Sequence, residues 1–494
     1  MLSFRRLGYG LLLIGIIITL CSYMGWLEEP RAIFDTTDLL HTGTRKCHSE
    51  LADVRKALNL PNRFQYGRRT FLAKPVKKLL PQSVVHREEK LFQGLDEINF
   101  HDRDCAVWVE DQPVEMEFQM PQRTMVDPAT LMIGASTTLS RLEKALPQMA
   151  RWLGNTSTPL IVNIKDSNDY ERFEKIQEQA EALHIDATLV LNVDHGPEKE
   201  DRHAHRHFSI LKVLNRYKLP STKWFAIIDD DTFFPSLTNL LEALEPYNPA
   251  EEWYIGALSE DWHTIANRFG FMAYGGAGIF LSAPLFDTLY ENFESCKAVG
   301  GLEGDRLYRD CIYLHTSPPV QLTLLPGLNQ MDFFGDPSGW YESGIPKENG
   351  PLSIHHLNGW HRYPVQYGHI VSDICGSGKG GCFLQRYKFN DDIILTNGYS
   401  LVEYPNGMMP TDLDRVEGTF LHEKGQFDFS LGALREKVSE KISWRLEYSV
   451  AEEDGRVRQF YVKRGGKKDR PKDDEKRMEL DVTGVFEIDW RVVK

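Results

Sequence analysis

Residues 223–231 read KWFAIIDDD, an apolar run that ends in three carboxylates. An uninterrupted apolar run bounded by charge is typical of a buried β-strand. Three adjacent carboxylates repel one another, so a strand that ends in them requires a compensating charge, and a divalent cation such as Mg²⁺ or Mn²⁺ supplies it. In extended backbone Asp229 and Asp231 lie on one side and Asp230 points away. The alternative is an acidic turn that caps the helix indicated by PSLTNLLEAL (235–244).

Short apolar runs alternate with helix-like segments around this stretch. The runs are TLMIGAS (130–136), PLIVNIK (159–165) and ATLVLNV (187–193), and the helix-like segments cover 138–153, 169–184 and 207–217. Such alternation predicts βαβ units, and therefore a mainly parallel, Rossmann-like α/β sheet whose ligands lie beyond the carboxyl ends of its strands. We expect the chemistry near Ser136, Lys165 and the aspartate run.

The composition excludes several classes of protein. The chain has 494 residues, of which 41% are hydrophobic and 26% charged, so it is not disordered, collagen-like or a coiled coil. Its 57 basic and 71 acidic residues give a net charge of −14. This sign is wrong for a protein that binds nucleic-acid phosphates, and we expect no nucleic-acid partner.

The N-terminal stretch 7–26 is uncharged and spans about 30 Å as a helix, the thickness of a bilayer core. Arg5 and Arg6 precede it and Glu28 and Glu29 follow, which predicts a single-pass type II signal-anchor with a cytosolic tail at 1–6. The competing interpretation is a cleaved signal peptide, but the apolar core is long and no A-x-A-like site follows it.

The remaining chain divides by its texture into three parts. Residues 27–125 lack sustained periodicity and are interpreted as a lumenal stem. The α/β domain is expected over 126–383. Beyond it, runs such as WRLEYSV (444–450) and RQFYVKR (458–464) alternate apolar and polar residues, which predicts a small β-rich accessory domain over 384–494.

Three further motifs carry candidate site residues. YGGAGIFLS (274–282) joins glycines to an apolar run, so backbone can approach a ligand closely there, although an ordinary tight turn has the same composition. Glu303-Gly304-Asp305 is an acidic candidate. LSIHHLN (352–358) places two histidines beside an apolar segment. A histidine in such a place is more often a core residue, but together with the distant aspartates His355 becomes a candidate ligand for Mn²⁺.

The motifs WFAIIDDDTFF, YGGAGIFLS, EGDRLYRDCIY and LSIHHLNGWH resemble, in order, those of the Fringe-like β1,3-glycosyltransferases of glycosyltransferase family 31, and most closely its DUF604-type members. The resemblance covers roughly residues 130–385. It implies a GT-A fold in the Golgi lumen, a nucleotide-sugar donor, usually a UDP-sugar, and inversion at the anomeric carbon of the transferred sugar.

The resemblance also implies a role for each matching residue. In the family, the aspartates of a DXD-type motif and a histidine bind the metal. By motif position these ligands correspond to Asp229, Asp231 and His355, with His356 as the alternative if the register slips by one. Asp305 corresponds to the proposed catalytic base, with Glu303 as its rival. The segment Gly134 to Thr138 corresponds to the first loop around the nucleotide. The residues assigned to the nucleotide-sugar are Ser136, Thr137, Asp166, Asp230 and Gly276.

The mechanism implied is transfer of a sugar to a hydroxyl of a glycan or glycoprotein. Asp305 would accept the proton of the attacking hydroxyl, and the cation would neutralise charge on the departing diphosphate. Two rivals remain open. One is an inactive relative that binds glycans in the lumen, with the C-terminal β region as the recognition module, and the other is a metal-dependent nucleotide-sugar hydrolase. The sequence determines neither the donor sugar, nor the acceptor, nor the oligomeric state.

Six cysteines lie outside the predicted anchor, and an even number suits an oxidising compartment. We expect Cys296 to pair with Cys311 and Cys375 with Cys382, which leaves Cys47 and Cys105 for each other. The sequon Asn155-Thr156-Ser157 weakly supports a lumenal glycoprotein.

Overall fold

The computed structural model describes residues 48–80, 82–100, 112–119, 127–165, 169–191, 207–299, 304–343, 350–357, 359–421, 427–465 and 482–493. Within these residues, no helix combines the length and the apolar character needed to cross a membrane. The predicted anchor, residues 7–26, lies outside them and stays a prediction.

A seven-stranded sheet contains the motif strands in the order β11-β9-β10-β8-β5-β6-β7. Its strands are β5 (Leu131–Thr137), β6 (Leu160–Ile164), β7 (Ala187–Leu191), β8 (Trp224–Ile228), β9 (Tyr254–Gly256), β10 (Ile279–Ser282) and β11 (Leu322–Leu324). Only β10 runs antiparallel to its two neighbours. The predicted mainly parallel α/β sheet is therefore confirmed.

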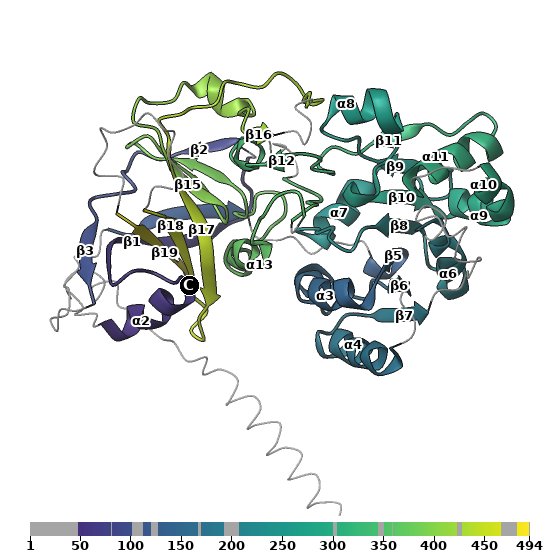
Figure 1. The fold of residues 1–494 in the computed structure, drawn as a ribbon, viewed down its shortest axis with the longest axis horizontal. Helices are drawn as coiled ribbons and strands as arrows, with labels where there is room; N and C mark the ends of the chain where they lie inside the picture. Colours follow the sequence, from purple (N-terminus) through teal and green to yellow (C-terminus); the bar gives the residue numbers. More distant parts are fainter. Residues whose placement is uncertain are drawn as a thin grey trace, which may run out of the picture. The chain divides into compact units, whose positions relative to one another are not determined.

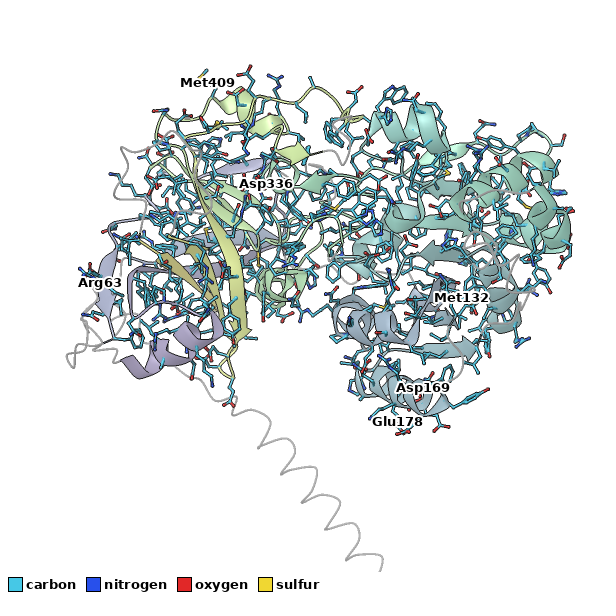
Figure 2. All side chains as sticks on the ribbon, in the orientation of Figure 1. Arg63, Met132, Asp169, Glu178, Asp336 and Met409 are labelled. Carbon is cyan, nitrogen blue, oxygen red and sulfur yellow. A yellow bond between two sulfur atoms is a disulfide. The ribbon has the colours of Figure 1, made fainter. Side chains whose placement is uncertain are left out.

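Helices cover both faces of this sheet (Figure 1). They are α3 (Leu139–Leu153), α4 (Tyr170–Ala182), α6 (Ile210–Tyr217), α7 (Leu237–Leu244), α9 (Ala283–Glu291), α10 (Phe293–Val299) and α11 (Gly304–His315), with a short turn η1 (Pro128–Thr130) before β5. Side chains alternate along β5, because Ile133 joins the apolar core that includes α3 whereas Met132 joins the core that includes α6. Figure 2 labels Met132 within this sheet.

The segment between β9 and β10 is built from short turns: α8 (Trp262–Thr264), the π-helix η2 (Ile265–Phe269) and η3 (Gly275–Ala277). The end of this segment, residues 274–278, is the first half of the motif YGGAGIFLS, and β10 is the second half. Single-turn π-helices occur frequently at functional sites.

A second sheet has ten strands: nine follow one another in the order β2-β13-β14-β15-β17-β18-β19-β1-β3, and the tenth, β4, pairs with β1 off this path. Its strands are β1 (Arg63–Val76), β2 (Val84–His86), β3 (Asp96–Asn99), β4 (Val114–Gln119), β13 (Arg386–Lys388), β14 (Ile393–Thr396), β15 (Ser400–Glu403), β17 (Ile442–Ala451), β18 (Val457–Lys463) and β19 (Gly484–Val492). The remaining elements are α2 (His48–Ala57), α12 (Ser338–Tyr341), α13 (Val365–Gly368), η4 (His369–Val371), α14 (Ser372–Cys375) and η5 (Pro410–Asp414), with the pair β12 (Phe334–Gly335) and β16 (Phe420–Leu421).

The structure differs here from the predicted division of the chain. Two parts of the segment interpreted as a stem, within residues 48–100 and 112–119, form α2 and β1–β4, and β1 pairs in parallel with β19 near the C-terminus. The apolar pattern of β1 is interrupted by arginines, of which Arg68 is buried because it pairs with Asp489 and Glu487 of β19. Charges that are neutralised by a strand 400 residues away conceal a buried strand from sequence periodicity.

Candidate active site

Asp229 and Asp231 follow directly on β8, and His355 reaches them from a distant segment. The connection is a pair of backbone hydrogen bonds between Phe233 and Ile354, both 2.8 Å, which sets His355 beside the aspartates. His355 Nε2 lies 3.1 Å from Asp231 Oδ1 and 3.4 Å from Asp229 Oδ2. The structure therefore brings together the three residues predicted to hold the metal.

Two contacts hold the buried imidazole of His355 in this orientation. Its Nδ1 is 2.9 Å from the carbonyl oxygen of Gln330, so Nδ1–H donates there and Nε2 faces the carboxylates. A Cβ atom on Gly276 would lie 2.0 Å from the ring, so only glycine fits beneath it. Burial lowers the pKa of His355, but the hydrogen bonds that its ring donates to Asp229 and Asp231, together with the charges of these carboxylates, outweigh burial and raise the pKa well above its usual value.

A divalent cation would neutralise the charge of the two carboxylates beside His355. Two carboxylates and an imidazole on a common centre are hard and intermediate ligands that suit Mn²⁺ or Mg²⁺. One ligand atom each of Asp231, His355 and His356 also lie within 4.8 Å of one another. Asp229 has a side chain 41% exposed, so the site is open on one side to a further ligand.

His356 plays a different part from His355 in this geometry. Its Nε2 lies 3.3 Å from Asp332 Oδ1. Its ring stacks at 4.1 Å on Trp360, which itself stacks at 4.2 Å on Phe334 of β12. His355 contacts both aspartates, whereas His356 is tied to Asp332 and stays the alternative ligand.

Asp305 is placed at the first turn of α11, against the glycines of the YGGAG motif. The amide of Gly275 donates to Asp305 Oδ2 at 2.8 Å, and a Cβ on Gly275 would lie 2.7 Å from Asp305 Oδ1. The Asp305 side chain is 24% exposed. The candidate base is thus oriented by backbone and still reachable. Its rival Glu303 lies outside the described residues.

His207 is a site residue that the sequence analysis missed. The buried ring lies between the two candidate centres, with Nε2 3.9 Å from Asp229 Oδ1 and Nδ1 4.0 Å from Asp305 Oδ1. A Cβ on Gly304 would lie 2.7 Å from this ring, which explains the glycine between the two acids of the EGD motif. The histidine-rich stretch RHAHRH (202–207) was the signal that could have drawn attention to it.

Three of the residues predicted to bind the nucleotide-sugar, Ser136, Thr137 and Asp230, lie at the ends of β5 and β8. Asp230 points away from the aspartate pair, accepts a hydrogen bond from Thr137 Oγ1, and forms a two-pronged ion pair with Arg141 whose Nε–Oδ2 distance is 2.6 Å. Arg141, which the sequence analysis missed, is 62% exposed and lies 3.9 Å from Asp231. Ser136 Oγ is buried and has no hydrogen-bond partner among the described residues.

The positions of the predicted nucleotide residues follow from this arrangement. Ser136 and Thr137 lie at the end of β5 and Gly276 lies under His355, whereas Asp166 is outside the described residues. Cys296 pairs with Cys311, which joins α10 to α11, and Cys375 pairs with Cys382. Both predicted disulfides are confirmed. Cys47 and Cys105 lie outside the described residues.

The central part of the chain matches two known sequence families. Residues 175–313 match the family described as Fringe-like, and residues 266–366 match DUF604, a family described as a protein of unknown function. Over this part of its length the chain is similar to the Fringe-like family, and the resemblance predicted from its motifs is confirmed. The match supports the predicted class of enzyme, a glycosyltransferase. No curated protein sequence matches the chain.

Several solved structures are similar to part of the chain. They include the mannosyltransferase PcManGT from Pyrobaculum calidifontis in complex with GDP-Man and Mn²⁺, at 14% identity and a TM-score of 0.28, covering 42% of this chain and 59% of that one. GlyE from Streptococcus pneumoniae is similar at 15% identity and a TM-score of 0.27, covering 40% and 45%. Mouse xyloside xylosyltransferase 1 is similar at 13% identity and a TM-score of 0.27, covering 40% and 85%. The match spans less than two thirds of the first two proteins.

Proposed function

We propose that this protein is an inverting, metal-dependent glycosyltransferase that moves a sugar from a nucleotide-sugar, a UDP-sugar, to a hydroxyl of a glycan or glycoprotein in a β1,3 linkage. We further propose that it acts in the Golgi lumen as a single-pass type II membrane protein. The supporting observation is that Asp229, Asp231 and His355 meet at one strand end, with Asp305 beside them across His207.

The arrangement separates two duties. The carboxylates and His355 would hold Mn²⁺ or Mg²⁺, which neutralises the charge of a departing diphosphate. Asp305 accepts the proton of the attacking hydroxyl, because its Oδ2 is held by the Gly275 amide and its side chain stays accessible. Arg141 is positioned by Asp230 and presents a cation beside Asp231, where it would bind phosphate oxygens.

The experiment is to incubate the purified full chain with Mn²⁺ and a panel of nucleotide-sugars, with and without glycan acceptors. Transfer of sugar to an acceptor supports the proposal. Release of free sugar alone would show a hydrolase. If the chain binds glycans saturably but neither transfers nor releases sugar, it is an inactive glycan-binding relative, which is the second candidate function.

A further inference from the structure

An exposed aromatic pair lies on the segment that leads into the YGGAG motif. Trp262 is 43% exposed and Phe271 is 57% exposed, and their rings meet edge to face with centroids 5.9 Å apart. Large aromatic side chains are normally buried, so two together on one surface indicate a binding role. We call residues 262–271 the aromatic loop.

The backbone of the aromatic loop is anchored at both ends, although its aromatic rings are exposed. At its start, the amide of Trp262 donates to the carbonyl of Asp428, and the carboxylate of Asp261 accepts from the amides of His263 and Asp428. The two contacts with Asp428 come from the C-terminal part of the chain. A loop held in this way presents its rings without a large ordering cost on binding.

At its other end the aromatic loop is tied to the helix that carries the candidate base. Arg309 of α11 donates from Nη1 to the carbonyl of Phe269 at 2.8 Å. Gly270 has a positive φ of +85°, which turns the chain so that Phe271 follows on the outside. Because α11 begins at Gly304 and Asp305, the helix that is bonded to the aromatic loop also carries the candidate base.

The aromatic loop is also close to Asp305 along the chain. Gly275, whose amide donates to Asp305, is only four positions after Phe271, so the Cα atoms of Phe271 and Gly275 are at most about 14 Å apart. The rings are therefore within reach of a molecule bound at Asp305.

The aromatic loop lies apart from most of the residues predicted to bind the nucleotide. Ser136, Thr137 and Asp230 lie at the ends of β5 and β8, whereas the aromatic loop is part of the connection from β9 to β10, further along the sheet. Of the candidate nucleotide residues that the structure describes, Gly276 alone belongs to this connection, in η3. Figure 1 shows α8 at the β9 and β11 end of this sheet and α3 beside β5. This separation assigns the aromatic loop to the second substrate.

We propose that Trp262 and Phe271 form an acceptor subsite that binds a saccharide by packing its apolar C–H face on their rings. The inference rests on the proposed function and names its acceptor class. The negative face of an aromatic ring attracts the partial positive charge of sugar C–H groups, and the edge-to-face pair offers two such surfaces at an angle. Such a subsite holds the acceptor while its hydroxyl lies at Asp305.

The test measures binding of the labelled full chain to an array of immobilised saccharides in the presence of UDP and Mn²⁺. Trp262→Ala and Phe271→Ala are expected to weaken binding of the saccharides that the unmodified chain binds by about threefold to tenfold each. Trp262→Phe and Phe271→Tyr should keep most of it. Tyr170→Ala is the matched control, because Tyr170 is a 65% exposed aromatic on α4, and it should have no effect.

Binding of UDP with Mn²⁺, measured by calorimetry, should be equal in all these variants. The proposal is overturned if the alanine variants bind saccharides like the unmodified chain, if they lose UDP binding to the same degree, or if the unmodified chain binds no saccharide. Failure of the proposed function has another signature. A chain that binds saccharides through Trp262 but neither binds UDP nor transfers sugar would retain this subsite and lose the transferase.

Discussion

Gly276 shows most directly how single atoms define the metal site. A methyl group there would lie 2.0 Å from the buried ring of His355, so the ring or the backbone must move. Gly276→Ala is expected to weaken Mn²⁺-dependent UDP binding at least tenfold and to lower stability by about 1–3 kcal/mol. Gly378→Ala is the matched control, since its nearest contact would be 3.6 Å. Calorimetry and thermal melting measure both effects, and equal behaviour of the two variants would contradict the packing argument.

Substitutions of Asp305 and of Asp231 should separate proton abstraction from metal-dependent donor binding. Asp305→Asn keeps the hydrogen bond from Gly275 but removes the base, so turnover should fall by at least a hundredfold while UDP and Mn²⁺ binding stays nearly intact. Asp231→Ala removes a carboxylate 3.1 Å from His355 and should weaken metal-dependent donor binding as well. Chelation of the metal should imitate Asp231→Ala and not Asp305→Asn. Similar losses of donor affinity in both variants would refute this division.

The residues that the sequence revealed are those whose chemistry is local. The aspartate run was visible because three carboxylates directly follow an apolar strand, and His355 because it stands in a motif. His207 and Arg141 were missed for a physical reason. Each becomes a site residue only through a partner about 90 to 100 residues away, Asp305 for His207 and Asp230 for Arg141, and no local pattern encodes such a contact.

At the scale of elements, periodicity identified strands with two uniform faces and failed for strands with buried charge. β8 is apolar throughout and was predicted from its five residues. β1 has fourteen residues with arginines among them, and its partner β19 contains the buried acids Glu487 and Asp489. The folded part of the predicted stem was therefore invisible until its distant partner strand was known.

The segment after β9 makes a pH-dependent contribution to stability. Burial, together with the charge of Asp332, raises the pKa of Glu260 to about 8. Between about pH 4.5 and pH 8 the folded chain retains a proton that the unfolded chain releases, so stability falls as the pH rises through this window. Glu260→Gln removes this dependence. The melting temperature of the Glu260→Gln variant should rise relative to that of the unmodified chain as the pH increases from 5 to 8, corresponding to on the order of 3–4 kcal/mol. A difference that stays constant with pH would contradict the assignment.

At the scale of the whole molecule, the described parts of the two sheets share one apolar core. A continuous cluster of buried side chains runs from Ile133 of β5 to Phe71 of β1 and Trp490 of β19. Residues 427–430 also bond to residues 259–262, which lead into the aromatic loop. The C-terminal β region is thus built into the support of the candidate site, and we expect both sheets to unfold together.

Trp490→Ala tests this coupling far from the candidate metal. Trp490 is fully buried and packs edge to face on Phe71 at 5.0 Å, so its removal should cost about 3–5 kcal/mol. If the sheets form one cooperative unit, the melting curve should stay a single transition at lower temperature, and UDP binding should be lost in that same transition. Val492→Ala, at a 46% exposed position on the same strand, should change little. An early transition in Trp490→Ala that leaves UDP binding intact would instead show that the C-terminal region unfolds as a separate domain.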